Sequence, residues 1–210
     1  MFRLPQLPYP YESLAPVVSA DTLHAHHDKH HAKYVDVMNG LLEQRGDQPG
    51  PLEDVVRAAA SGGERKLYNN AAQAWNHAFF WDCMTPSSAG PGDGVREAAN
   101  KAFGGLDQLR TKFVSEGADH FASGWAWLVA RNGGLEILST HDAGSFDQFE
   151  GAVPLLVCDV WEHAYYLDHK QDRKGFLEKW FDGIANWDLA ERQLQAAAGS
   201  GSAWRYPDAA

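Results

Sequence analysis

Histidine is concentrated in one short stretch of this 210-residue chain: five of its ten histidines fall within LHAHHDKHHAKY, at residues 24 to 31. Imidazole nitrogens bind transition metals and carry protons near neutral pH, so this density indicates metal or proton chemistry. On a helix, His26 and His30 share one face, and His27 and His31 share a neighbouring face. Taken alone, the stretch fits a metal site and a solvated histidine-rich face equally well.

Two later segments place histidines beside apolar and aromatic residues. His77 lies within WNHAFFW, where a buried imidazole without a partner would cost about 1–3 kcal/mol. A core histidine bonded to a carbonyl would satisfy it as well as a metal. In CDVWEHAYY, Asp159 ends an apolar run and His163 follows four residues later, and a buried carboxylate needs a compensating cation. With His26, the set becomes three imidazoles and one carboxylate, which suits iron, manganese or zinc.

The elements that must position these residues are helices first and strands later. Three N-terminal helices are expected, over residues 19–44, 52–60 and 64–84. A Pro/Gly/Ser linker follows at 86–94. Beyond it we expect two helices, over 95–103 and 106–117, and then three strands, over 124–130, 135–140 and 153–160. The segment RNGG between the first two strands is a hairpin signal. Helices return at about 162–198, between an extended arm at 1–18 and a loosely held tail at 196–210.

This order predicts an α+β fold: an N-terminal α-helical hairpin followed by a C-terminal domain with a three-stranded antiparallel sheet flanked by helices. The linker marks the boundary between the two parts. We expect an N-terminal helical-hairpin domain over residues 1–88 and a C-terminal α/β domain over residues 89–210.

Composition argues against some binding partners and indicates a cellular location. The formal net charge of -10 argues against a general nucleic-acid or anionic-membrane surface. The first twenty residues carry four prolines and no uninterrupted apolar core, unlike a signal peptide or a membrane span. Two cysteines, Cys83 and Cys158, are too few for a disulfide framework. We therefore expect a cytoplasmic protein that binds neither nucleic acid nor membrane.

Four segments in the same order resemble those of the iron/manganese superoxide dismutases: HHDKHHAKYV, AAQAWNHAFFW, SGWAWLV and DVWEHAYYLDH. The last is the most specific, because it is similar to that family's D-x-W-E-H-A-Y-Y signature. The resemblance extends over almost the whole chain, from LPQLPYPYESLAP to NWDLAE. It implies disproportionation of superoxide to oxygen and hydrogen peroxide at a mononuclear metal that alternates between its 3+ and 2+ states.

The resemblance also implies roles for individual residues. One metal ion per subunit would be bound by His26, His77, Asp159 and His163. The groups expected to take part in proton transfer and solvent positioning are His30, Tyr34 and Gln73. An aromatic wall around the metal would be formed by Trp81, Trp127 and Trp161. His27 and His31 would then be structural.

A symmetric homodimer is implied as well, with pairing into tetramers as a further option. Glu162 would reach His163 of the partner subunit, and Tyr166 would reach His30 of the partner subunit. Arg173 resembles the arginine at the family's substrate entrance.

The resemblance favours iron. A glutamine within AAQxWNH, here Gln73, is similar to the iron-type branch, whereas the manganese type carries its glutamine in a later segment. That segment reads STHDAG here, with Ala143 at the corresponding position. Manganese, or use of either metal, is the alternative.

Two alternatives from other classes use the same residues. A non-catalytic metal-binding scaffold of the same fold is disfavoured because all four ligands and Tyr34 are present. A zinc hydrolase is disfavoured because Gln73 cannot take a proton and so cannot serve as a general base.

Overall fold

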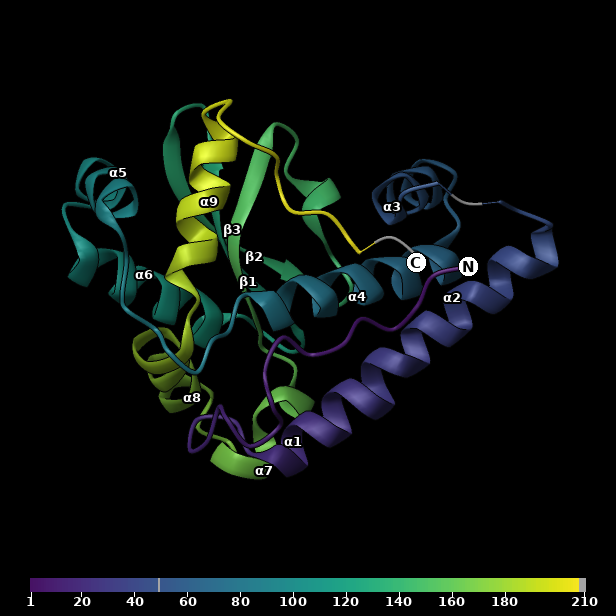
Figure 1. The fold of residues 1–210 in the computed structure, drawn as a ribbon, viewed down its shortest axis with the longest axis horizontal. Coiled ribbons are helices and arrows are strands. Elements are labelled where there is room, and N and C mark those ends of the chain that lie inside the picture. The colour runs from purple at the N-terminus through teal and green to yellow at the C-terminus, as the bar shows by residue number, and fades with distance from the viewer. Residues whose placement is uncertain (49, 208–210) are drawn as a thin grey trace.

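The computed structural model describes residues 1–48 and 50–207, which form a helical half and a half built around a sheet (Figure 1). The helical half contains α1 (Ala20–Ala25), η1 (His26–His31), α2 (Ala32–Arg45), α3 (Leu52–Ser61) and α4 (Arg65–Asp82). The second half begins with α5 (Asp93–Phe103), α6 (Leu106–Asp119), β1 (Gly124–Arg131), β2 (Gly134–His141), η2 (Phe146–Gln148) and β3 (Ala152–Asp159). It ends with η3 (Glu162–Ala164), α7 (Tyr166–His169), α8 (Arg173–Lys179), η4 (Trp180–Ile184) and α9 (Trp187–Ala197). The predicted α+β class is confirmed.

The first arm of the hairpin is one continuous helical stretch from α1 to α2, close to the expected 19–44. The hydroxyl oxygen of Ser19 caps it by accepting a hydrogen bond from the backbone N–H of Thr22 (3.2 Å). Gly46 ends it in the left-handed conformation (φ 71°), which is least costly for glycine. The sequence did not predict the π-helical turn η1, which widens the helix at HHDKHH.

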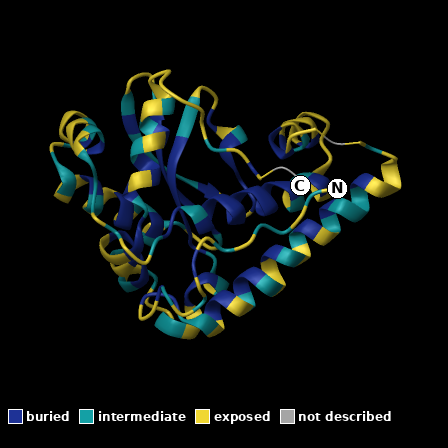
Figure 2. Cartoon of the chain, in the orientation of Figure 1, coloured by how far each residue is buried: buried dark blue, intermediate teal, exposed yellow. Residues whose placement is uncertain are grey.

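The second arm, α4, is buried at every position from Ala71 to Trp81 (Figure 2). It packs against α2 and α3 within the hairpin and against β3 of the sheet. A helix buried in this way leaves its polar side chains no access to water, so each must find a partner inside the protein. This requirement applies to Gln73, Asn76 and His77.

The sheet has strand order β2-β1-β3, with both pairings antiparallel. Asn132 and Gly133 connect β1 to β2 with positive φ values of 53° and 75°, as the hairpin signal predicted. In the register between β1 and β3, Trp125 lies opposite Asp159. The register shifts between Leu128 and Val129, so the partner of a β1 residue beyond the shift cannot be found by counting along β3 from Asp159.

Helices cover the sheet and fix its position against the hairpin. α9 packs on β3, whereas α5 and α6 pack on β2 (Figure 1). The central strand β1 is buried at seven successive residues from Gly124. The hairpin and the sheet therefore share one continuous core, and the end of β3 lies against the C-terminal half of α4.

The tail is more ordered than expected. Tyr206 is 5% exposed, and the backbone N–H groups of Trp204 and Tyr206 are both hydrogen-bonded, so the prediction of a loosely held tail is wrong for residues 204–206. Residues 208–210 of that prediction lie outside the described residues. Within 1–48 and 50–207, no helix combines the length and the apolar character needed to cross a bilayer.

Candidate metal centre

Four side chains far apart in the sequence meet between the hairpin and the sheet: His26, His77, Asp159 and His163. One donor atom from each lies within 4.8 Å of the others. Oδ2 of Asp159 is 3.1 Å from Nε2 of His26, 3.7 Å from Nε2 of His77 and 3.2 Å from Nε2 of His163. Three ring nitrogens thus surround one carboxylate oxygen, as the ligands of a single ion would.

Both halves of the molecule contribute to this cluster. His26 is the first residue of the turn η1, and His77 lies in the C-terminal half of α4. Asp159 is the last residue of β3, and His163 follows in the short helix η3. The other carboxylate oxygen of Asp159, Oδ1, accepts a hydrogen bond from the backbone N–H of Trp161 (2.8 Å), which fixes the carboxylate plane.

Within the histidine-rich turn, some rings point toward the cluster and others bond to the protein backbone. His26 and His30 lie on the same side, with ring centres 6.3 Å apart. Nε2 of His31 hydrogen-bonds to the carbonyl oxygen of Ala74 (3.0 Å). His27 contacts the carbonyl oxygen of Pro5 through Nε2 (2.8 Å). His27 and His31 are therefore bound to protein groups, in agreement with the structural interpretation.

Two ring nitrogens of the cluster are buried and have no hydrogen-bond partner among the described residues. Within residues 1–48 and 50–207, Nε2 of His26 and Nε2 of His77 make no hydrogen bond, and the two residues are 1% and 0% exposed. Nδ1 of His77 donates to the carbonyl oxygen of Gln73 (2.7 Å), which leaves Nε2 as the free lone pair. A buried acceptor without a partner is costly, and a cation at this position would remove that cost.

The electrostatic environment favours the protonation states that metal binding requires. Burial lowers the pKa of His26 to about 4, and it lowers the pKa of His77 well below the ordinary histidine value. Burial by itself raises the pKa of Asp159, but the interactions of its carboxylate with the neighbouring rings of His163 and His26 outweigh burial, so the pKa is lowered. Asp159 is therefore ionised at neutral pH, while His26 and His77 are neutral. The donor set fits an iron, manganese or zinc ion with a free coordination position.

Trp81 and His31 form a hydrogen-bonded pair beside His26, the first predicted ligand. The indole ring of Trp81 lies 4.8 Å from the ring of His26, centre to centre. Its Nε1–H donates to Nδ1 of His31 (2.9 Å), whose other nitrogen bonds to Ala74. The structure thus places Trp81 beside the cluster. The hydrogen bond from Trp81 to His31 was not foreseen, because the sequence does not show which ring an indole N–H will reach.

Gln73 links two aromatic side chains beside the cluster. Its carbonyl oxygen Oε1 accepts a hydrogen bond from Nε1–H of Trp125 (3.1 Å), and its amide Nε2 donates to the hydroxyl oxygen of Tyr34 (3.5 Å). The ring of Tyr34 lies 5.3 Å from that of His77. Burial raises the pKa of Tyr34, so the hydroxyl keeps its proton at neutral pH.

The structure brings Trp125, and not Trp127, to the cluster, which corrects our prediction for Trp127. The ring of Trp125 lies 5.0 Å from that of His77. Trp127 instead donates its Nε1–H to Oγ1 of Thr140 (2.9 Å), and its ring contacts Phe149 at 5.2 Å. The two indoles share a face of β1, two residues apart. The pairing register between β1 and β3, which places Trp125 opposite Asp159, decides which indole meets the cluster. That register could not be predicted from the sequence.

The remaining predicted residues lie toward the surface. His30 is exposed, and its ring stacks on that of His163 at 4.3 Å. The ring of Trp161 lies 5.6 Å from His163. Glu162 and Tyr166 are both exposed, so the structure places them on the outside of the chain next to the fourth predicted ligand.

Arg173 lies at the start of α8, half-buried, with its guanidinium fixed by neutral groups. It donates hydrogen bonds to the hydroxyl oxygen of Tyr165 (3.0 Å) and to the carbonyl oxygens of His120 and Ala122. Among the described residues it forms no ion pair with a carboxylate. Its positive charge is therefore not neutralised locally.

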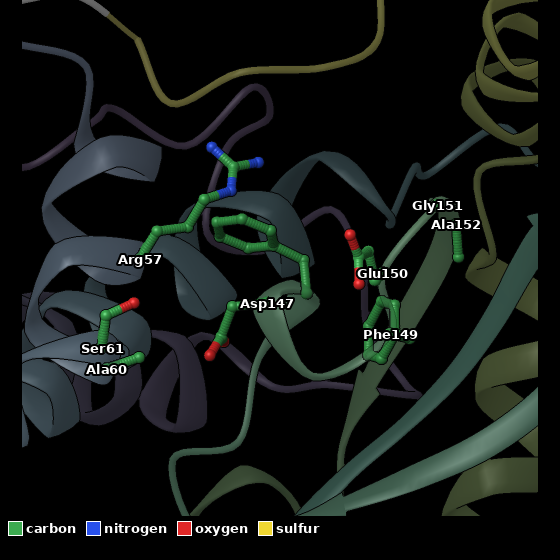
Figure 3. Close-up of a pocket in the computed structure, with 9 residues that line it drawn as sticks. Arg57, Ala60, Ser61, Asp147, Phe149, Glu150, Gly151 and Ala152 are labelled. Atoms are coloured by element: carbon green, nitrogen blue, oxygen red, sulfur yellow. The ribbon is translucent and has the colours of Figure 1, made fainter.

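A surface pocket of about 390 Å³ lies elsewhere, between α3 and the segment that leads into β3 (Figure 3). Arg57 lies on its rim, with its guanidinium carbon 5.0 Å from the ring centre of Phe146, and Asp147 and Glu150 also line it. None of its lining residues belongs to the predicted site. The pocket is open to solvent and has no group of three metal-binding side chains, so the buried cluster is the better candidate for the site.

Known protein families match both halves of the chain. Residues 1–85 match the family described as "Iron/manganese superoxide dismutases, alpha-hairpin domain", and residues 91–193 match its C-terminal domain. A relative from Entamoeba histolytica, named "Superoxide dismutase [Fe]", is 46% identical over 193 residues, covering 92% of this chain and 99% of the relative. A protein of the same name from Coxiella burnetii is 42% identical, covering 93% of this chain and 99% of its own. "Superoxide dismutase [Mn]" from Rhizobium meliloti is 44% identical, covering 94% and 98%.

Proposed function

Since this chain belongs to the iron/manganese superoxide dismutase family and converts superoxide to oxygen and hydrogen peroxide, we propose that it does so at an iron ion bound by His26, His77, Asp159 and His163. One observation carries the ligand assignment. The four donor atoms lie within 4.8 Å of one another, and two of the ring nitrogens are buried without any hydrogen-bond partner.

The ligands would set the charge and orientation of the site. When bound, the ion supplies single-electron exchange with superoxide by alternating between its 3+ and 2+ states. Asp159 contributes one negative charge, so the site stays net positive and attractive to an anion. The bond from Nδ1 of His77 to the carbonyl oxygen of Gln73 fixes the tautomer that presents Nε2 to the ion.

Protons for peroxide would pass through Tyr34 and His30. The hydroxyl of Tyr34 accepts from the Gln73 amide and keeps its own proton for donation. His30 is exposed and stacks on His163, so it lies between the cluster and solvent. Trp81, Trp125 and Trp161 would exclude bulk water, and the unpaired charge of Arg173 would attract superoxide toward the entrance.

Iron rather than manganese is the metal we propose. Gln73 stands on α4, with its amide 3.5 Å from the Tyr34 hydroxyl, and Ala143 leaves the later segment without an amide. The Entamoeba and Coxiella relatives are named for iron, although the Rhizobium relative is named for manganese.

We therefore expect iron in the natively produced protein and higher dismutase activity per bound metal after reconstitution with iron than with manganese. Elemental analysis and a superoxide-consumption assay on metal-free protein reloaded with each metal measure this. Zinc, which binds similar ligands but has no redox chemistry, is the control and should restore no activity. Turnover restored by manganese alone would contradict the role given to Gln73.

A homodimer is also part of the proposal. Tyr166 and Leu167 are 45% and 56% exposed, and Phe121 is 89% exposed. Arg173 links the two segments that carry them, since it donates to Tyr165, which precedes Tyr166, and to Ala122, which follows Phe121. Exposed apolar side chains gathered in this way are typical of an interface. Glu162 would contact His163 of the partner subunit, and Tyr166 would contact His30 of the partner subunit.

Light scattering should give about twice the chain mass of 23.2 kDa. Leu167→Glu is expected to shift the mass toward one chain, because a carboxylate would be buried in the interface. Glu97→Gln, at an exposed carboxylate on α5, is the control and should leave the mass unchanged. A single-chain mass for the unmodified protein would exclude the dimer.

The domain boundary at residues 88/89 and a cytoplasmic location complete the proposal. The two family matches end at residue 85 and begin at residue 91, and the chain between α4 and α5 is non-helical, which supports the boundary. Cys83 and Cys158 are buried free thiols, which agrees with a reducing compartment.

A further inference from the structure

The chain continues past the family match, which ends at residue 193, and folds back on the hairpin. Residues 202–207, called here the C-terminal strap, leave the end of α9 and run beside α4 toward the N-terminal arm (Figure 1). The strap belongs covalently to the sheet half, but most of its contacts are with the helical half.

Four hydrogen bonds hold the strap. Nε1–H of Trp204 donates to Oδ2 of Asp82 at the end of α4 (2.6 Å). The backbone N–H of Tyr206 donates to Oε1 of Glu53 in α3 (2.8 Å), and its hydroxyl donates to the carbonyl oxygen of Arg3 (2.7 Å). The fourth runs from the backbone N–H of Trp204 to Gln193 (2.7 Å). Three of the four acceptors therefore lie in the helical half.

Ring packing adds to these bonds. Trp204 lies 5.1 Å from Trp75 and 5.0 Å from Phe79, centre to centre, and both partners are on α4. Those two residues flank His77 on either side in the sequence. Glu53 ties the same region together, because its Oε1 also accepts from Nε1–H of Trp75 (2.8 Å). The strap thus rests on the segment of α4 that carries the second predicted ligand.

Trp204 also connects the strap to the strand that carries the third predicted ligand. Gln193 on α9 accepts from Trp204 through Oε1 and donates through Nε2 to the carbonyl oxygen of Pro154 in β3 (2.7 Å). Gln193 is 3% exposed, and both ends of its amide are used. A continuous path therefore connects β3, through Gln193 and Trp204, to α4.

We propose that the C-terminal strap clamps the helical half onto the sheet half and so holds His26 and His77 in position against Asp159 and His163. This rests on the proposed function, since the clamp matters for the metal only if those four residues bind it. The strap is a positioning element and touches none of the ligands. Its effect on the metal is a slower release, because release requires the two ligand pairs to separate.

The full-length double variant Trp204→Ala/Tyr206→Ala tests this clamp. In the metal-free protein, we expect faster hydrogen exchange at the amides of Thr85 and Asn186, which donate to Ile184 and Cys83 across the two halves. In the iron-loaded protein, we expect iron to be lost to a chelator at least about tenfold faster, because the variant removes the two side-chain hydrogen bonds to Asp82 and Arg3 together with the ring packing of Trp204. Trp204→Phe keeps a ring but not the donor to Asp82, so its effect should be intermediate. It replaces the double variant in both measurements if the double variant does not fold.

Two controls separate the clamp from general destabilisation. Arg205→Ala changes an exposed side chain between the two anchors and should leave both rates unchanged. Leu109→Ala removes a buried side chain of α6 without touching the strap and should lower the thermal midpoint but not speed iron loss. Equal rates in the double variant and the unmodified protein would overturn the proposal, as would iron loss from Leu109→Ala as fast as from the double variant. If the proposed function alone failed, the intact protein would bind no iron while the strap-dependent difference in exchange persisted.

Discussion

Asp159→Asn is expected to leave a folded protein that no longer retains iron. The substitution keeps an oxygen that can accept from the backbone N–H of Trp161, so the loop after β3 should hold its shape. It removes the only negative charge among the four predicted ligands. Loss of a group that merely orients a metal ligand already costs 10–100-fold in affinity, so we expect a loss of more than about 100-fold here. Elemental analysis and circular dichroism of the purified variant measure binding and folding separately.

A matched carboxylate outside the cluster provides the control. Asp147 accepts a hydrogen bond from the hydroxyl of Tyr68 (3.0 Å) and lines the surface pocket of Figure 3. Asp147→Asn should keep one iron per chain and full activity. An Asp159→Asn protein that still carried one tightly bound iron would show that the ion lies elsewhere.

Replacing Trp125 by alanine should cost both stability and catalysis. Trp125 is fully buried, so truncation should lower the free energy of unfolding by about 3–5 kcal/mol, out of the 5–15 kcal/mol typical of a folded protein. It should also leave Oε1 of Gln73 without its donor and free the amide to rotate away from Tyr34. Activity per bound iron should therefore fall by at least about tenfold. Urea unfolding and activity normalised to iron content measure the two effects.

Trp127 is a closely matched comparison, because it has the same side chain, the same strand and the same burial. Trp127→Ala should cost a similar free energy of unfolding, since its indole also loses a hydrogen bond, to Thr140. It should leave activity per bound iron close to normal. Equal losses of activity in both variants would mean that the position of Trp125 beside His77 has no catalytic consequence.

The order and type of the elements could be predicted because their signals are local. Prolines and glycines separate the helices, and RNGG specifies the hairpin between β1 and β2. The aromatic wall could only partly be predicted. Trp125 and Trp127 face the same side of β1, and the choice between them depends on the pairing with β3, in which Trp125 lies opposite Asp159 and Trp127 opposite Val157. Pairing between strands is a tertiary property that no local pattern encodes.

The order of the C-terminal tail could not be predicted, for a different reason. Its glycine and serine content predicted a loosely held segment, because such residues lose much conformational entropy on ordering. Trp204 and Tyr206 override that tendency by burying aromatic surface and by donating to Asp82, Glu53 and Arg3. The acceptors lie more than 100 residues away in the sequence, so composition gave no sign of them.

The π-helical turn at His26–His31 constrains how the gene could change. Removing one codon from this turn would let the backbone close as an ordinary α-helix, but the preceding segment would rotate by about 100°, the angle between successive α-helical residues. His26 would then swing away from His77, even though the stretch kept nearly all of its histidines. The number of residues in this turn is therefore restricted more tightly than their identities.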